Sequence, residues 1–231
     1  GFDTKTNIVE LLNKLVLIPG EFFLRVGMGN PRHMMAYIDD LIAIMKHPKV
    51  FKFIHLPVQA GSSKVLSFMK RQHSVEDYLY LAQKLRAEIP EITISTDIIV
   101  GHPGEEEDDF LQTLDVLKIT KPSVCNRTRF VPRQGTPAAN MQQLPKLIKK
   151  DRSKRVTDLF KEIALSNNQD WMGWQGKIVI DEFGKAAGTR SGRNYAYKPV
   201  IVKGEFEFGE IIQVKVTGIE TFCLLAEVLP V

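Results

Sequence analysis

A turn of glycine, proline and acidic residues follows an apolar run near the middle of the chain. The stretch STDIIVGHPGEEEDDF, residues 95–110, passes through Gly101 and Gly104 into five consecutive acids, Glu105 to Asp109. Acids in the first turn of a helix complement its dipole and its free N–H groups, and they repel an anion from the same place. We therefore expect a helix to start here, and a ligand that is neutral or positively charged, such as a sulfonium, rather than a phosphate.

Three other apolar runs end in similar turns. RVGMGNPRH, HLPVQAGSS and RFVPRQGTP each break into Gly, Pro, Gln, Asn or Arg after the run. Ligands of parallel α/β folds bind where the strands finish, so the four turns together favour one ligand cavity at a single rim. Within them, Gln59 suits ribose hydroxyls or an adenine edge, and it equally suits a turn-capping amide.

Two of these regions could add charged contacts to such a cavity. Arg129 and Arg133 flank the aromatic Phe130, a combination suited to nucleic acid or to a carboxylate. Arg71 follows Lys70 at the end of an expected helix, where exposure to solvent is the ordinary outcome.

Positive charge is concentrated in one part of the chain, whose formal net charge is +4. Residues 118–161 contain twelve Lys and Arg residues against two Asp residues. An expected helix in this segment carries Lys149 and Lys150, and a basic helix face is most often simply solvated. The concentration nevertheless favours a polyanionic partner.

The last sixty residues combine cations with aromatic side chains. The stretch GTRSGRNYAYKP interleaves Arg190, Arg193 and Lys198 with Tyr195 and Tyr197. Cations hold phosphates while rings stack on bases, so this mixture suits single-stranded or looped RNA. Packing between neighbouring strands would explain the tyrosines but not the clustered arginines.

Several other classes of function are disfavoured. Cys125 and Cys223 lie far apart in apolar segments, which is typical of buried thiols in a reducing compartment. The five histidines lack ligand spacing, so we expect no metal site in this chain. No run of 18 apolar residues and no targeting segment is visible, and we expect a cytoplasmic protein without a membrane span. The chain begins Gly-Phe-Asp without methionine, which indicates a trimmed or partial chain.

Apolar periodicity predicts alternating helices and strands in the first part of the chain. We expect strands at residues 21–28, 50–59, 92–101 and 123–132, and helices at 5–18, 31–47, 105–119 and 144–168, with one or two more within 62–88. Such alternation implies about four parallel strands with right-handed crossovers. They could form a small open sheet or one side of a (β/α) barrel, and the pattern alone does not decide.

The pattern of apolar and polar residues changes after residue 170. Segments at 176–183, 185–190, 195–204, 210–219 and 221–229 alternate or are β-branched between glycine-containing turns. About five short strands predict a small antiparallel β-barrel of the kind that binds nucleic acid. We expect a domain boundary between residues 168 and 171.

Taken in order, these motifs resemble the radical S-adenosylmethionine tRNA methylthiotransferases. The resemblance rests on HLPVQAGS, MKRQHSVEDY, STDIIVGHPGEEEDDF and RFVPRQGTPAA, followed by a basic helix. GMGNPRH and GRNYAYKPV are closest to the archaeal and eukaryotic branch, which acts on N6-threonylcarbamoyladenosine beside the anticodon. The resemblance implies that residues 1–168 are the carboxy-terminal portion of a radical SAM barrel. It also implies that residues 169–231 are a TRAM domain, an OB-like β-barrel that binds RNA.

The resemblance also implies roles for individual residues. Gln59 and the turn of Gly101, Gly104 and Glu105 would lie against S-adenosylmethionine, Arg71 would meet its carboxylate, and Arg129 and Phe130 would lie near the adenine or the substrate base. The residues expected to bind RNA are Arg133, Lys149, Lys150, Arg190, Arg193, Tyr195 and Lys198.

One departure from the family is large. Radical SAM enzymes hold a 4Fe–4S cluster on a CxxxCxxC triplet, which this sequence lacks, so the cluster ligands are absent from the chain. By resemblance, the intact enzyme adds a methylthio group to C2 of the modified adenine in tRNA and requires an electron donor. We expect this chain to be part of that enzyme, to contain no catalytic residue of its own and to be inactive alone.

Two alternatives stay open. The chain could be a non-catalytic RNA-binding module, or part of a radical SAM methylthiotransferase that acts on a ribosomal protein. The positive charge of residues 118–161 favours RNA over protein as the substrate.

Overall fold

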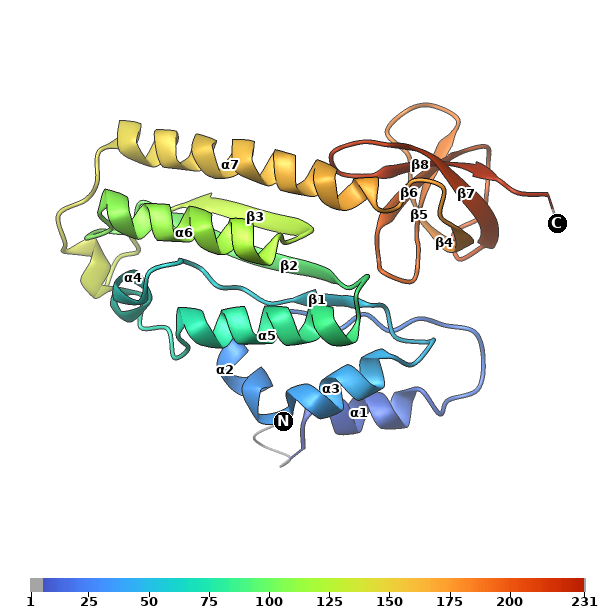
Figure 1. Ribbon diagram of the computed structural model, residues 1–231, viewed down its shortest axis with the longest axis horizontal. Helices are drawn as coiled ribbons and strands as arrows, with labels where there is room; N and C mark the ends of the chain where they lie inside the picture. Colours follow the sequence, from blue (N-terminus) through green and yellow to red (C-terminus); the bar gives the residue numbers. More distant parts are fainter. Residues whose placement is uncertain (1–5, 231) are drawn as a thin grey trace.

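The computed structural model describes residues 6–230 of the chain. A helix-rich half with a parallel sheet leads into a small β-barrel, and the long helix α7 (Lys146–Gln169) joins the two (Figure 1).

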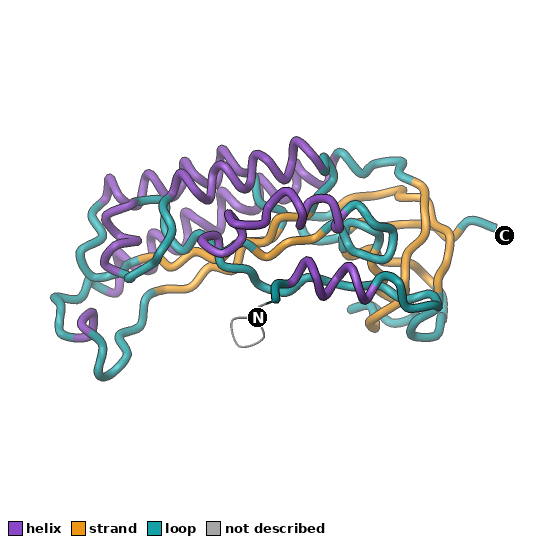
Figure 2. The backbone as a smooth tube through the Cα atoms, turned by 90° about the horizontal axis from the view of Figure 1, so that it is seen from below, coloured by secondary structure: helices purple, strands orange, loops and turns teal. Residues whose placement is uncertain are grey.

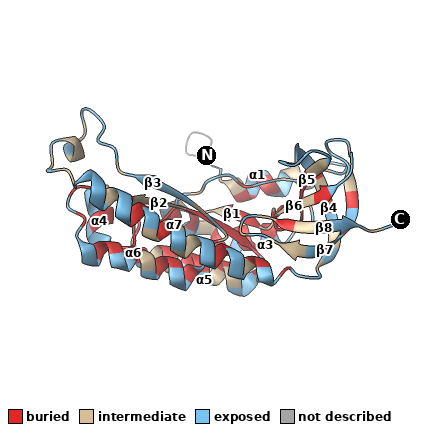
Figure 3. Cartoon of the chain, turned by 90° about the horizontal axis from the view of Figure 1, so that it is seen from above, coloured by how far each residue is buried: buried red, intermediate tan, exposed pale blue. Residues whose placement is uncertain are grey.

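Three parallel strands form the sheet of the first half. They are β1 (Phe53–His55), β2 (Thr93–Val100) and β3 (Val124–Arg129), in the order β1-β2-β3. The side chains of Ile94 and Ile98 on one face of β2 are completely buried. β3 is an edge strand and is largely exposed (Figure 3).

Helices precede and connect these strands, and most of the helical residues lie on one face of the sheet (Figure 2). They are α1 (Ile8–Leu15), α2 (Pro31–Met34), α3 (Ile38–Met45), α4 (Ser63–Phe68), α5 (Val75–Glu88) and α6 (Glu107–Thr120), together with 3-10 turns at Met35–Tyr37 and Pro137–Ala139. The expected helix at 31–47 is therefore interrupted by a 3-10 turn, while the region 62–88 forms two helices. Residue 5 of the expected first helix lies outside the described residues.

The prediction of four parallel strands is wrong by one strand. Residues 21–28 form only isolated parallel bridges, from Leu24 to Val50 and from Met28 to His55. The segment runs along the outer edge of β1, and only Val26 is buried among residues 21–28. Within the described chain, hydrogen bonds to the neighbouring segment are made only at Leu24 and Gly29, so too few backbone groups are paired to make a continuous strand.

The second half is a closed barrel of five strands. They are β4 (Gln175–Phe183), β5 (Thr189–Arg193), β6 (Pro199–Lys203), β7 (Ile211–Ile219) and β8 (Leu224–Val228), in the order β4-β5-β6-β8-β7. The prediction of an antiparallel barrel needs correction, because β6 and β8 pair in parallel. The connection through β7 returns the chain in the direction of β6, so the barrel is mixed.

The barrel contacts the amino ends of the parallel strands. The N–H of Lys52, just before β1, donates to the carbonyl of Tyr195 at 2.8 Å. The ring of Tyr197 packs against Phe51 and Phe53, with ring centroids 5.0 and 5.1 Å apart. Each half has its own group of buried apolar side chains, and the expected boundary at residues 168–171 stays a prediction.

Candidate cofactor site at the carboxyl ends of the strands

The loops that follow the three strands gather at the end of the sheet opposite the barrel (Figure 1). We call this end, formed by residues 56–62, 101–106 and 130–145, the strand-end rim. Gln59 extends the sheet into the rim: its N–H donates to the carbonyl of Asp97, and its carbonyl accepts from Ile99, both at 2.9 Å. Its φ of 74° is unusual for a residue other than glycine and turns the chain immediately after this pairing.

The turn after β2 is held by its own acid. Gly101 and Gly104 have φ values of 77° and 84°, in the left-handed region that favours glycine. Within the turn, the N–H of Gly101 donates to a carboxylate oxygen of Glu105 at 2.6 Å. The donor that a phosphate would need at this position is therefore already used by the protein.

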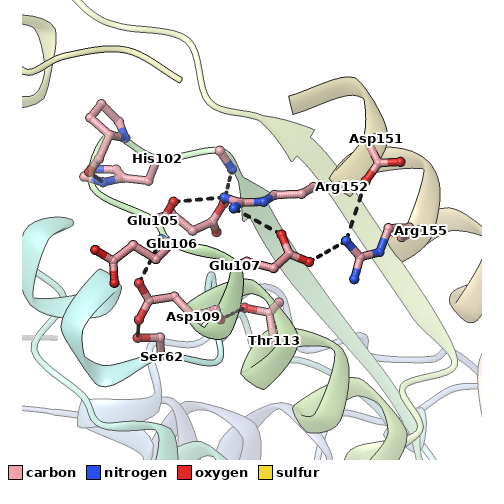
Figure 4. A network of polar contacts seen from close by, with 12 residues as sticks. Ser62, His102, Glu105, Glu106, Glu107, Asp109, Thr113, Asp151, Arg152 and Arg155 are labelled. Atoms are coloured by element: carbon pink, nitrogen blue, oxygen red, sulfur yellow. Dashed lines mark hydrogen bonds and ion pairs between the residues drawn. The ribbon is translucent and has the colours of Figure 1, made fainter. Parts of the chain in front are cut away.

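Glu105 forms a buried ion pair with Arg152 of α7 (Figure 4). The two charged groups are 2.6 Å apart, with side-chain exposures of 1% for Glu105 and 5% for Arg152. The same guanidinium donates to the main-chain carbonyl of Glu105 at 3.0 Å and contacts Glu107 at 3.3 Å. Burial raises the pKa of Glu105, and the donors of Gly101 and Arg152 counteract that effect.

The acids that follow Glu105 mostly form ion pairs and hydrogen bonds within the protein. Glu106 and Asp109 pair with Lys64 at 2.9 and 3.0 Å, and the main-chain N–H of Glu106 donates to Asp109 at 2.9 Å. Ser62 also donates to Asp109 at 2.6 Å, which ties the loop after β1 to the start of α6. Three acids do lie in the first turn of α6, as expected. Glu105 precedes the helix and instead accepts the hydrogen bond from Gly101 in the rim.

Aromatic rings line the rim beside this turn. His102 is buried, and its ring lies 4.8 Å from that of Phe130 and 6.3 Å from that of Phe68. Burial lowers the pKa of His102, which favours the neutral imidazole. Lys149 of α7 extends over the Phe130 ring at 5.4 Å and donates to its carbonyl at 3.2 Å. The partly exposed ring of Phe130 suits stacking on an adenine ring.

The structure therefore brings part of the predicted cofactor site together. The predicted members at the rim are Gln59, Gly101, Gly104, Glu105 and Phe130, and Arg129 directly precedes it. Arg129 is exposed at the end of β3. Arg71 is also exposed, and it lines a separate shallow depression of about 520 Å³ between α4 and α5.

The residues predicted to bind RNA are split between the two ends of the molecule. Arg133 and Lys150 are exposed at the rim and at the start of α7, near Lys149. Arg190 and Arg193 belong to the barrel and are engaged there: Arg190 donates to the carbonyl of Phe206 at 3.1 Å.

Two basic residues of the barrel are less available than the sequence predicts. Arg193 pairs with Asp181 at 2.7 Å and with Glu182 at 3.1 Å. Lys198 is only 6% exposed and lies between the barrel and the sheet, where its ammonium donates to Asn168 at 2.8 Å.

A polar cluster on the open face of the sheet was missed by the sequence reasoning. His55, Asp97 and Asn126 come from the three adjacent strands, and Asp97 accepts from Asn126 at 2.9 Å and contacts His55 at 2.8 Å. The signal was present in β2, where Asp97 interrupts an apolar run at a position facing away from the helices. This cluster places an imidazole, a carboxylate and an exposed amide together on that face.

The described residues do not fit an iron–sulfur cluster. Within residues 6–230, no three His, Cys, Asp or Glu side chains are grouped so that they could hold a metal ion. Cys125 and Cys223 belong to different halves of the chain. Burial raises their thiol pKa values to about 12 and about 11, whereas a cluster requires thiolates. Over the same residues, no helix is long and apolar enough to cross a membrane.

Comparison with known proteins shows the family. The chain is 41% identical to a probable threonylcarbamoyladenosine tRNA methylthiotransferase of Archaeoglobus fulgidus over 90% of this chain and 48% of that protein. It is 37% identical to the protein of the same description from Pyrococcus horikoshii, over 99% of this chain and 53% of that protein. It is 35% identical to the human threonylcarbamoyladenosine tRNA methylthiotransferase, over 94% of this chain and 37% of that protein. The chain thus spans about half the length, or less, of these relatives.

The family model of the Radical SAM superfamily matches residues 2–117, which include β1, β2 and the turn from Gly101 to Glu105. The resemblance read from the motifs is thereby confirmed, and the chain belongs to the radical SAM superfamily.

Proposed function

We propose that this chain supplies the S-adenosylmethionine cradle and an RNA-binding surface of an enzyme that methylthiolates N6-threonylcarbamoyladenosine in tRNA. The observation that carries the proposal is the strand-end rim, where the Gly101–Glu105 turn is locked by Arg152 beside Phe130. The names of the relatives support tRNA, rather than a ribosomal protein, as the substrate. A tRNA substrate also agrees with the expected cytoplasmic location.

The charge distribution of the rim fits S-adenosylmethionine better than a phosphate ligand. Glu105 occupies the N–H of Gly101, so that donor is not free for an anion, and Arg152 compensates the charge of Glu105. The partly exposed ring of Phe130, supported by the buried His102, offers a surface to an adenine, and Gln59 lies at the same rim. S-adenosylmethionine supplies the radical and the methyl group of the family's chemistry, while these residues bind and orient it.

The exposed cations near the rim support an RNA contact at this end. Arg129, Arg133, Lys146 and Lys150 are exposed, and none of them forms an ion pair within residues 6–230. Their neighbours on α7 are compensated: Arg155 pairs with Glu107 at 2.6 Å. Free cations attract the phosphate backbone and make binding depend on salt. We propose that these four residues bind tRNA and that the barrel, as a TRAM-type unit, adds a second contact.

A non-catalytic RNA-binding module is the second candidate. The observation that favours it is that no group of cluster ligands exists among residues 6–230. Both candidates predict RNA binding, so only a measurement of chemistry separates them.

A chimera tests the proposed function. This chain would replace the matching half of the Archaeoglobus fulgidus relative, so that the cluster-binding half comes from the relative. Expressed in cells that lack this modification, the chimera should produce 2-methylthio-N6-threonylcarbamoyladenosine, detected in digested tRNA by mass spectrometry. Ribosomal proteins from the same cells are analysed in parallel and should carry no new methylthio group.

Matched variants link the outcome to the rim. Glu105→Ala should abolish product, because it frees the Gly101 donor and leaves the buried Arg152 with only its 3.3 Å ion pair to Glu107. Glu227→Ala, at the exposed end of β8, serves as the control and should leave the product level unchanged. A folded chimera that binds tRNA yet forms no product would support the RNA-binding module instead.

A further inference from the structure

A second cavity lies where the barrel meets the helix-rich half. It measures about 350 Å³, within the ordinary size range for small-ligand sites. Arg86 of α5 and Ser123 before β3 line it from one side, and Trp171, Tyr195 and Lys198 line it from the other. Its lining residues Ile92 and Ser123 directly precede β2 and β3, so the cavity adjoins the amino ends of these strands, at the opposite end of the sheet from the strand-end rim.

Three aromatic rings form one wall of this interface pocket. The rings of Trp171 and Trp174 lie 5.7 Å apart, and Tyr195 lies 5.8 and 6.0 Å from them. Trp171 is buried, whereas Trp174 and Tyr195 keep part of their surface open. A flat ligand can stack on those two rings.

Two cations in the pocket have no carboxylate partner. Lys198 is only 6% exposed. Its ammonium has three N–H donors but one hydrogen-bond partner, Asn168. Arg86 donates to the carbonyls of Thr120 and Lys121 at 3.2 and 2.6 Å. Within the described chain, neither forms an ion pair. A buried cation without a counter-charge favours an anion in the cavity.

The acids of the pocket are at its mouth. Glu91 and Asp170 line the cavity, but both are exposed to solvent. With Arg86, Tyr195 and Lys198, they are the titratable groups that face it. The interior is therefore positive and the entrance negative, an arrangement that suits a ligand with an anionic group and N–H donors.

We propose that the interface pocket binds a nucleotide. Lys198 and Arg86 hold its phosphate, and the base stacks on Trp174 and Tyr195, with its amino hydrogens available to Glu91 or Asp170. The nucleotide is either free or part of a bound RNA. Only the second source depends on the proposed function, since a free nucleotide would bind whether or not the chain modifies tRNA.

Intrinsic tryptophan fluorescence offers a direct test, because the chain has two tryptophans and both line this pocket. AMP, adenosine and inorganic phosphate are titrated separately into the 231-residue chain. AMP should change the fluorescence with a dissociation constant below about 1 mM, and adenosine and phosphate should each bind at least about tenfold more weakly. Binding should weaken as the pH rises past about 8, the lowered pKa of Lys198, because the neutral amine no longer attracts phosphate.

Three variants and one control assign the contacts. Lys198→Met and Arg86→Gln should each weaken AMP binding roughly ten- to hundredfold, and Trp174→Leu should do so about tenfold. Lys203→Met, an exposed lysine on β6 outside the pocket, should have no effect. Arg86→Gln keeps a donor for the carbonyls, so it carries the test if Lys198→Met does not fold.

The remaining outcomes either identify the source or overturn the proposal. Competition of AMP by saturating tRNA assigns the site to a nucleotide of RNA, and undisturbed AMP binding assigns it to a free nucleotide. The proposed nucleotide site would be overturned by no fluorescence change up to about 5 mM AMP, or by an equal loss of AMP affinity in Lys203→Met and Lys198→Met. An inactive chimera with intact AMP binding would count against the proposed function alone.

Discussion

At the residue scale, five adjacent acids have different roles. Glu105 is buried against Arg152, while Glu107 lies at the surface with an exposed fraction of 52% and pairs with two arginines. The sequence predicts that the acids begin a helix, but it could not pair Glu105 with Arg152, because that partner is 47 positions away in α7. A partner so distant leaves no periodic signal around the acid.

Removing Arg152 should therefore be costly. Arg152→Met leaves the Glu105 carboxylate buried without its counter-charge, and we expect the free energy of unfolding to fall by about 3–5 kcal/mol. Arg155→Met breaks a more exposed contact to Glu107 and should cost no more than about 1 kcal/mol. Urea unfolding followed by circular dichroism measures both.

A second substitution tests the cause of that loss. Glu105→Gln, added to Arg152→Met, removes the uncompensated charge but keeps an acceptor for the Gly101 N–H, so part of the stability should return. Equal stability of the Arg152 and Arg155 variants would show that burial of the pair has little energetic weight.

At the element scale, the success of strand prediction follows how much backbone pairing each segment makes. Residues 93–100 form a continuous strand because neighbours pair with β2 on both sides. Residues 21–28 are also apolar, but they pair only through isolated bridges at Leu24 and Met28, and the strand does not form. The parallel pairing of β6 with β8 also escaped prediction, since alternation along a strand carries no information about the direction of its neighbour.

The start of α7 and the end of β3 should dominate the salt dependence of RNA binding. Arg129→Ala and Lys150→Ala each remove one exposed, unpaired cation, so the slope of log affinity against log salt should fall by about 0.7–0.9 for each. Fluorescence anisotropy with labelled tRNA at several salt concentrations gives the slope. Lys14→Ala, an exposed lysine at the end of α1, is the charge-matched control. A slope that Lys14→Ala lowers equally would mean that net charge alone drives binding.

At the scale of the whole molecule, the junction between the halves was not visible in the sequence. Lys198 was expected to contact tRNA because it lies among arginines and tyrosines. It instead extends from the barrel to Asn168 of α7, and Tyr197 beside it packs on Phe51 and Phe53. Contacts between segments some 150 positions apart depend on how the two halves dock, which local composition does not encode.

The buried Lys198 should make the free energy of unfolding increase as the pH rises above about 8. Burial lowers the pKa of Lys198 to about 8 from the model-compound value of 10.5, so the unfolded chain binds this proton more tightly between those values. Stability should therefore rise with pH in that window, by up to about 3 kcal/mol. The measurement is the free energy of unfolding at pH 7 and pH 10, relative to Lys198→Met, which cancels the other titrating groups. A difference that is flat over this range would show that the ammonium is well solvated.

Helix α7 fixes a length for any RNA that uses both ends of the protein. Lys146 begins the helix near the strand-end rim, and Asn167 lines the interface pocket near its other end. At 1.5 Å per residue these two positions are roughly 32 Å apart. An RNA that contacts both sites while lying along this helix must therefore extend for roughly 32 Å, and a shorter segment would reach only one of them.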